Sequence, residues 1–189
     1  MTINQIKKVA LIQFTEKGYE GTSLSDIAQE VGIKKQSIYS HFKNKDELFL
    51  TVTHQAINEE IEFLHDFFIQ KKPDLKDYLK SFIVQIKERY IQNEGSNIEF
   101  LLRIAYMPPL HLKDQVIKNV NQYFFELEDL VNKSFLNEID QSVKVNNATL
   151  SFMTMLDGLF VALIYGGMER FEQKFKASWN IYWQGLLHS

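Results

Sequence analysis

Apolar residues recur along almost the whole chain at steps of three and four, the spacing that places them on one face of an α-helix. The first such stripe contains Ile3, Ile6, Ala10 and Phe14, and it ends at Gly18. The strict alternation that predicts half-buried strands is nearly absent. We therefore expect an all-α protein with about nine helices, of which the first ends at Gly18.

The next two predicted helices are short and are separated by a glycine. Ser23 is followed three residues later by Asp26, which resembles a capping box with Asp in place of Glu and predicts that a helix begins there. Gly32 can adopt the left-handed backbone that ends a helix without steric cost. A further short helix is then expected from residue 34 or 35 to about residue 41. Two short helices joined by a glycine turn indicate a helix-turn-helix.

Longer helices are predicted for the rest of the chain. Their expected ranges are 45–70, 75–91, a shorter helix before Pro108, 110–135, 148–168 and 170–187. We expect residues 1–46 to form a three-helix, helix-turn-helix domain. Residues 47–189 are expected to form a second, larger helical domain.

The composition restricts the chemistry and the location of the protein. The chain contains no cysteine, which excludes disulfides, thiolate zinc sites and cysteine nucleophiles and favours a reducing compartment. The N-terminal residues lack the apolar core and cleavage site of a signal peptide, so we expect a cytoplasmic protein. Residues 150–168 approach the length of a membrane span. Asp157 and three glycines within them favour a helix buried on several sides, and we expect no membrane association.

The charges are unevenly distributed along the chain. The formal net charge is −3, but residues 1–46 carry 7 Lys or Arg against 5 Asp or Glu. Lys34, Lys35, Lys43 and Lys45 fall within twelve residues that contain no acid, a pattern that suits contact with phosphates. A short lysine cluster is also a common feature of ordinary protein surfaces.

Polar side chains occupy the exposed face of the second helix of the predicted pair, in the half that enters the major groove in helix-turn-helix proteins. Gln36 could bind adenine through two hydrogen bonds, and Ser37 could bond several base edges. Backbone N–H groups near Thr22 and Lys45 could hold a phosphate. The expected DNA contacts are Thr22, Ser23, Lys34, Lys35, Gln36, Ser37, Tyr39, Ser40, His41 and Lys45. The alternative is that residues 23–42 are simply two packed helices with a solvated surface.

The same segment carries a resemblance to a known family. Residues 18–49, GYEGTSLSDIAQEVGIKKQSIYSHFKNKDELF, resemble the DNA-binding domain of TetR-type (tetracycline-repressor-like) transcriptional regulators. The resemblance covers roughly residues 6–52 and rests on the elements G-Y-x-G-T-S, D-I-A, G-I, I-Y-x-H-F and K-x-E-L. One departure is Lys34, where many relatives have Ser or Thr. The recognition helix is therefore expected to lack its usual side-chain cap.

The resemblance implies a homodimer in which the three-helix head binds a double-stranded DNA operator and the body binds a small-molecule effector. We expect a repressor that binds a palindromic operator and is released by a small, largely apolar or aromatic effector, without a cofactor. The resemblance also implies dimer contacts through the last two helices. The candidate dimer residues are Phe152, Leu156, Phe160, Phe175, Trp179 and Trp183, although core packing is an equally good explanation for several of them.

The effector is expected among the central helices, where aromatic and apolar residues dominate. The candidate lining residues are Phe82, Ile86, Phe100, Arg103, Tyr106, Phe124, Leu127 and Asp157, and most of the apolar ones would serve the core equally well. Asp157 is an acid within an apolar helix, which is costly unless it is paired. It is expected either to bond a neighbouring helix or to balance a cationic ligand.

Two other classes of function are considered. Glu62 and His65 form one Glu-x-x-His pair, half of a di-iron motif, but no second copy is present, and no metal site is expected. No nucleophile, phosphate-loop or dinucleotide motif occurs, so we do not expect an enzyme. A helical adaptor that binds another protein remains an alternative, and it would not depend on Gln36 and Tyr39.

Overall fold

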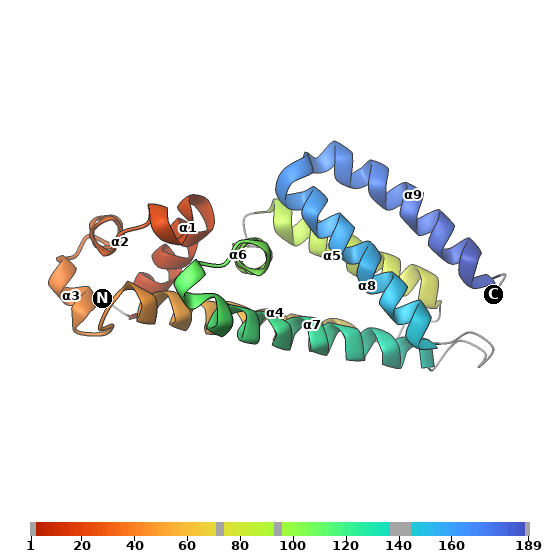
Figure 1. Cartoon of the computed structure of the whole chain (residues 1–189), viewed down its shortest axis with the longest axis horizontal. Coiled ribbons are helices and arrows are strands. Elements are labelled where there is room, and N and C mark those ends of the chain that lie inside the picture. The colour runs from red at the N-terminus through yellow and green to blue at the C-terminus, as the bar shows by residue number, and fades with distance from the viewer. Residues whose placement is uncertain (1–2, 71–73, 93–95, 137–144, 188–189) are drawn as a thin grey trace. The chain divides into compact units, whose positions relative to one another are not determined.

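The computed structural model describes residues 3–70, 74–92, 96–136 and 145–187. Within these ranges all regular secondary structure is helical, which confirms the predicted all-α class (Figure 1). The elements are α1 (Ile3–Gly21), α2 (Leu24–Val31), α3 (Lys35–Tyr39), α4 (Lys45–Phe68), α5 (Leu75–Ile91), α6 (Ser96–Tyr106), the 3-10 turn η1 (Leu110–Leu112), α7 (Lys113–Leu136), α8 (Val145–Val161), the π-helical turn η2 (Ala162–Gly166) and α9 (Gly167–Leu187).

The chain divides into two compact units. Unit 1 consists of residues 1–60 and 93–123, and unit 2 consists of residues 61–92 and 124–189. Helices α4 and α7 each begin in unit 1 and end in unit 2. These units do not coincide with the expected domains 1–46 and 47–189, and that division stays a prediction.

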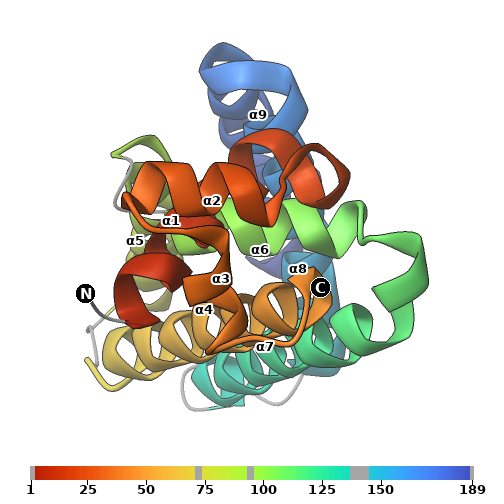
Figure 2. The ribbon, with the colours of Figure 1, turned by 90° about the vertical axis from the view of Figure 1, so that its left-hand side faces the viewer.

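Unit 1 is built around the apolar stripe of α1. Ile6, Ala10 and Phe14 are buried, and α1 packs against both α2 and α6 (Figure 2). Phe49 of α4 contacts two of these helices, because its ring makes edge-on contacts with Phe14 (centroids 5.0 Å apart) and with Phe100 of α6 (5.8 Å). These aromatic contacts hold together α1, α4 and α6, which support the short helices α2 and α3.

The first helix was predicted to end at Gly18, and in the structure α1 is interrupted at this residue but continues beyond it. Gly18 has φ +70° and ψ 175°, and helical turns continue beyond it to Gly21. The hydroxyl of Thr22 donates to the carbonyl oxygens of Gly18 (2.8 Å) and Gln13 (3.0 Å). These bonds satisfy carbonyls that the interruption leaves without helical partners.

Unit 2 has a core rich in aromatic residues. Phe67 of α4 stacks on Tyr78 of α5 at 5.0 Å and meets Phe82 edge-on at 5.3 Å. Helix α8 packs against α9, and the hydroxyl of Tyr182 in α9 donates to the carbonyl oxygen of Ala148 in α8 at 2.8 Å. Trp183 of α9 lies 6.4 Å from the ring of Phe135. The aromatic residues of this unit are thus used mainly to fill its interior.

The boundary between the last two helices differs from the prediction. The first of them was expected over 148–168, but α8 already ends at Val161 and is followed by the π-helical turn η2. Gly167, with φ +72°, then begins α9. A π turn has no capping residue or proline to mark it in a sequence, so periodicity alone extended the helix through it.

The apolar stretch near the end of the chain matches a membrane span by length and composition. Residues Val145–Leu186 contain an 18-residue window with a mean hydropathy of 1.6, and half of this window is buried within the protein. The core helix of a globular protein has the same properties, so this single segment is weak evidence for a span.

Candidate nucleic-acid interface

The first helix of the predicted pair is capped as expected. The backbone N–H of Asp26 donates to Ser23 Oγ, and the backbone N–H of Ser23 donates to Asp26 Oδ2, both at 3.1 Å. The hydrogen bonds that the Asp26 carboxylate accepts from the hydroxyl and from the backbone N–H of Ser23 hold its pKa below the usual value. A capping box therefore fixes the start of α2.

The turn between the two helices also has the predicted geometry. Gly32 has φ +77° and ψ 32°, which is the left-handed conformation. The N–H groups of Gly32 and Ile33 donate to the carbonyl oxygens of Gln29 (3.1 Å) and Ala28 (2.9 Å). This pairing closes the end of α2 and directs the chain into α3.

Helix α3 begins without a side-chain cap. Lys34 occupies the N-cap position and makes no capping hydrogen bond, as its replacement of Ser or Thr predicts. The helix is held instead by Ile38, which is fully buried, and by contact between α2 and α3. The position of α3 thus depends on one buried apolar residue, and the side chains on its other faces are available for contacts with other molecules.

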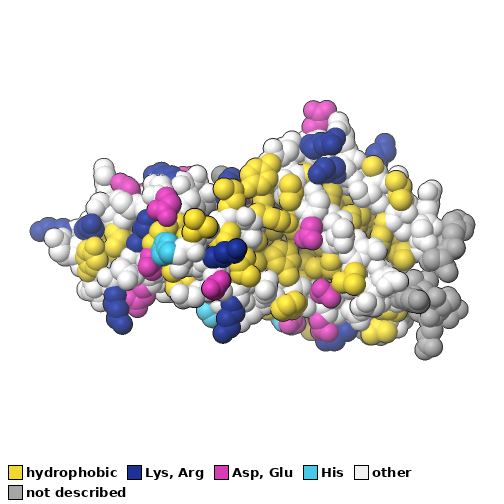
Figure 3. Space-filling model, viewed as in Figure 1, with side chains coloured by type: hydrophobic (Ala, Val, Ile, Leu, Met, Phe, Trp, Pro, Cys, Tyr) yellow, Lys and Arg dark blue, Asp and Glu magenta, His cyan; other side chains and the backbone are white. Residues whose placement is uncertain are grey.

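The exposed face of α3 brings together most of the predicted DNA contacts. Tyr39 is 49% exposed, and the ammonium of Lys35 lies 5.8 Å from the centre of its ring. Lys and Arg side chains project at the end of unit 1 that carries α3 (Figure 3). The exposed residues of this face are Lys34, Lys35, Gln36, Ser37, Tyr39, Ser40 and His41. This arrangement presents two cations and several hydrogen-bonding groups to one side of a short helix.

Two predicted contacts are placed differently. Thr22 is only 1% exposed, and its hydroxyl is bonded to backbone carbonyls, so its side chain is not at the surface. The predicted phosphate contact through backbone N–H groups near Thr22 stays a prediction. The ammonium of Lys45 donates to the carbonyl oxygens of Tyr19 (2.8 Å) and Thr22 (3.0 Å) and lies 3.9 Å from the centre of the Tyr19 ring. The Lys45 side chain therefore binds backbone carbonyl groups near the end of α1. Of Lys43 and Lys45, Lys43 is the exposed one.

The hydroxyl of Ser23, although exposed, is also engaged. It donates to Asp26 Oδ2 at 2.7 Å within the capping box. A phosphate could approach Ser23 only in competition with this carboxylate. The expected role of Ser23 in DNA contact stays a prediction.

Next to this surface lies a polar cluster that the sequence analysis missed. The hydroxyl of Tyr19 donates to Asp46 Oδ1, and His111 Nε2 lies 3.3 Å from the same oxygen. Burial and the bond to Asp46 raise the pKa of Tyr19, while the bonds from Tyr19 and His111 lower the pKa of Asp46. The cluster joins α1, α4 and η1, and no pattern links residues so far apart in the sequence.

The predicted effector residues fall in both units. Phe82, Ile86 and Leu127 are fully buried in unit 2. Phe124 is half-buried there. The remaining candidates outside α8 lie in unit 1, and they are Phe100, Arg103 and Tyr106. That these residues form one effector pocket stays a prediction.

Individual members of that set have other partners. Phe100 is part of the unit 1 core described above, and Arg103 forms an ion pair with Glu99 at 2.8 Å. Asp157 was expected inside the protein, but its side chain is exposed on α8, although partial desolvation raises its pKa. Whether Asp157 bonds a neighbouring helix or balances a cationic ligand stays a prediction.

The predicted dimer residues are buried within a single chain. Phe152, Leu156 and Phe160 of α8 and the three aromatic residues of α9 all lie in the core of unit 2, which favours the alternative of core packing. That any of them contacts a partner stays a prediction. Large aromatic side chains at helical spacing fill a core more often than an interface. The large exposed apolar residues of this region are Leu150 of α8, Tyr165 of η2 and Ile181 of α9.

The histidine considered as half of a metal motif has another contact. His65 Nε2 lies 3.4 Å from a carboxylate oxygen of Glu126. Within the ranges that the structure describes, no group of three His, Asp or Glu side chains is placed to hold a metal ion.

Comparison with known proteins relates the N-terminal segment to DNA-binding regulators. Residues 6–52 match the family described as bacterial regulatory proteins, tetR family. The biofilm operon icaADBC HTH-type negative transcriptional regulator IcaR of Staphylococcus epidermidis is 41% identical over 88 residues, or 44% of this chain. The match covers 46% of that relative, so it spans less than half of the relative's length. The matched relatives are transcriptional regulators.

Solved structures share the fold over nearly the whole chain. A transcriptional regulator of the TetR family from Agrobacterium tumefaciens has a TM-score of 0.75 at 20% identity and covers 94% of this chain and 95% of its own. The transcriptional regulator FadR from Bacillus subtilis, in complex with stearoyl-CoA, has a TM-score of 0.68 at 18% identity and covers 96% and 97%. At these identities the likeness concerns the fold.

Proposed function

We propose that this chain, whose residues 6–52 match the tetR family of bacterial regulatory proteins, is a homodimeric repressor that binds a palindromic DNA operator and is released by a small effector. The observation that carries the proposal is the exposed polar face of α3, which lies within the segment that matches the family. A negative regulator among the relatives supports repression rather than activation.

The operator is read by α3 in the major groove. Gln36 is placed to bond the N6 and N7 edge of adenine, and Ser37 to bond an adjacent base edge. Lys34, Lys35 and His41 bond phosphates, which set the register of the helix on the DNA. Lys43 takes over the phosphate contact that was expected of Lys45, because Lys45 is bonded within unit 1.

The dimer forms through the outer faces of α8 and α9. Leu150 (44% exposed), Tyr165 (60%) and Ile181 (72%) are large apolar residues that a single chain leaves in water. Hydrophobic side chains gather on the face of unit 2 that α8 occupies in Figure 3. Such patches favour contact with a partner, and two copies of one surface suit a twofold dimer. A dimer places two heads in successive major grooves, about 34–36 Å apart.

The effector is a largely apolar molecule. The aromatic residues of unit 2 favour an aromatic or acyl group, and the Bacillus subtilis neighbour of the same fold was solved with stearoyl-CoA. Helices α4 and α7 contribute to both units, so a ligand that prefers one tilt of α4 would change the spacing of the two heads. Only a difference in affinity between the two states can move this equilibrium.

The protein acts in the cytoplasm, where its DNA target lies, and not at a membrane. The absence of cysteine agrees with a reducing compartment. The apolar stretch of α8 and α9 supplies core and dimer contacts under this proposal.

Selection of bound fragments from genomic DNA tests the proposal. Purified protein is mixed with fragmented DNA of its source at about 0.15 M salt, where weak non-specific binding is largely suppressed, and the retained fragments are sequenced. An enriched palindrome is expected, and it should be lost with Gln36→Ala combined with Tyr39→Ala. Asn121→Ala, an exposed change on α7, is the matched control. Enrichment that survives the double change would contradict α3 as the reader, and no enrichment at all would favour an adaptor.

A further inference from the structure

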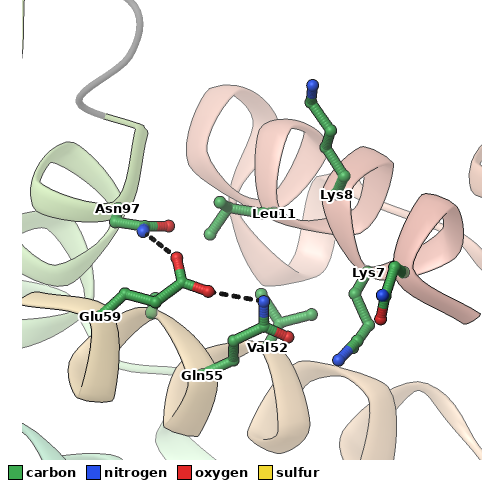
Figure 4. Close-up of a pocket in the computed structure, with 9 residues that line it drawn as sticks. Lys7, Lys8, Leu11, Val52, Gln55, Glu59 and Asn97 are labelled. Carbon is green, nitrogen blue, oxygen red and sulfur yellow. Dashed lines mark hydrogen bonds between the residues drawn. The ribbon is translucent and has the colours of Figure 1, made fainter.

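A cleft of about 360 Å³ lies within unit 1, away from the exposed face of α3. It is formed by α1, α4 and α6, and Figure 4 shows the residues that line it. Leu11, Val52 and Ala56 supply its apolar surface. A volume of this size lies in the range of small-molecule sites, which begins at about 300 Å³.

One end of the cleft carries a carboxylate that already has partners. Glu59 accepts a hydrogen bond from Gln55 Nε2 at 2.7 Å and another from Asn97 Nδ2 at 2.5 Å (Figure 4). Two amides therefore hold this side chain against α4 and α6. A negative group of a ligand would avoid Glu59 and would bind farther along the cleft.

Farther along, the cleft carries a cation for which the described residues supply no hydrogen bond or ion pair. Lys7 is half-buried, and its side chain extends from α1 toward α4 beside Val52 (Figure 4). The next residue, Lys8, also borders the cleft, but its side chain points away from α4 into solvent (Figure 4). A half-buried ammonium has lost part of its hydration, which an anion can replace.

We infer that this cleft binds a small organic monocarboxylate, with its carboxylate on Lys7 and its apolar body on Leu11, Val52 and Ala56. The bonded carboxylate of Glu59 disfavours a second negative charge on the ligand. The inference goes beyond the proposed function, because the cleft lies inside unit 1 and shares no residue with the predicted effector set. A ligand in this cleft contacts both α1 and α4, so it would act on unit 1 independently of the predicted effector site.

Binding of defined probes to the full-length protein tests this inference. Hexanoate, benzoate and 4-phenylbutyrate are titrated by ligand-observed NMR, each beside its uncharged primary amide. At least one carboxylate should bind about fivefold more tightly than its amide, the size expected for a partly exposed ion pair. Lys7→Gln should weaken that carboxylate about fivefold and leave the amide unchanged.

The neighbouring lysine provides a matched control. Lys8→Gln removes the same charge from the same helix but leaves the cleft intact, so binding should match that of the unchanged protein. The side-chain amide resonances of Gln55 and Asn97 in the unchanged protein provide a second measurement that needs no variant, because both residues line the cleft and a bound ligand should shift them.

Three outcomes would overturn the inference. The first is that no carboxylate of the panel binds more tightly than its amide. The second is that Lys7→Gln and Lys8→Gln reduce binding equally, which would indicate general attraction to a basic surface. The third is binding that leaves both amide resonances in place, which would indicate another site such as the effector pocket. DNA selection by the unliganded protein tests the proposed function separately.

Discussion

The helix pair of unit 1 and the helix pair α8–α9 of unit 2 differ in what their sequences reveal. In the first pair a capping box fixes the start of α2, a glycine turn fixes its end and Ile38 anchors α3, so the exposed face of α3 follows from the sequence. In the second pair the boundary is a π-helical turn followed by Gly167, which does not fix the rotation of the helices, and the residues predicted to face a partner are buried in the core. Short-range signals thus predict a surface well, whereas the outward face of a long helix depends on its tertiary packing.

Helix α9 offers the sharpest test of this difference. Trp179→Ala removes a buried ring that contacts Phe175 and Trp183, and it should lower the free energy of unfolding by about 3–5 kcal/mol. Ile181→Ser, two residues away and exposed, should change the stability of the isolated chain little but weaken the dimer. Denaturant unfolding and sedimentation at several concentrations separate the two effects. If Trp179→Ala abolished the dimer and left the stability of the chain unchanged, the original prediction that Trp179 contacts a partner would be supported.

The two lysines at positions 35 and 45 test the same contrast within unit 1. Lys45→Gln removes bonds to two carbonyl oxygens and should cost about 1–2 kcal/mol of stability. Lys35→Gln should leave the melting temperature unchanged and reduce the slope of log K against log salt for DNA binding by about one. Thermal unfolding and DNA titrations at several salt concentrations measure both. Equal effects of the two changes on DNA binding would mean that Lys45 leaves its carbonyl partners and contacts the phosphates.

The glycine turn should tolerate only residues that accept a left-handed backbone. Gly32→Ala places a Cβ at φ +77° and should destabilise the protein by about 1–2 kcal/mol. Gly32→Asn should cost less, because Asn adopts this conformation more readily. Denaturant unfolding of both variants provides the measurement, and equal losses would argue that the turn is not limited by its backbone conformation.

The smallest expected effect concerns the cluster around Asp46. The folded protein lowers the pKa of this carboxyl, so its stabilising contribution is present above the unfolded value of about 4 and is lost as the pH falls through the lower folded value. Wild type should therefore exceed Asp46→Asn in melting temperature at pH 7, and the difference should shrink toward pH 3. Asp129→Asn, an exposed change on α7, is a suitable control. A difference that stays constant with pH would exclude the carboxylate charge as its cause.

Features that depend on residues close together in the sequence could be predicted, whereas features that depend on distant residues could not. Helix α5 matches the expected range 75–91, because Asp74 accepts a hydrogen bond from the N–H of Asp77 at 2.7 Å and so marks its start. The cluster of Tyr19, Asp46 and His111 could not be predicted, since its members are 27 and 65 residues apart and meet only when α1, α4 and η1 pack together. The cleft beside Lys7 likewise depends on contacts between three helices.

Unit 1 is built from two separate segments of the chain, and this affects how it can fold during synthesis on the ribosome. Residues 1–60 emerge first, but α6, which covers the buried stripe of α1, is synthesised only after the residues of α5. Domains generally fold as units during synthesis, so the head should reach its final stability only once residue 123 has emerged. A nascent chain that stalls before α6 would expose Ile6, Ala10 and Phe14 to chaperones and proteases. Unit 1 would therefore mature only after the residues of α5, which belong to unit 2, have been made.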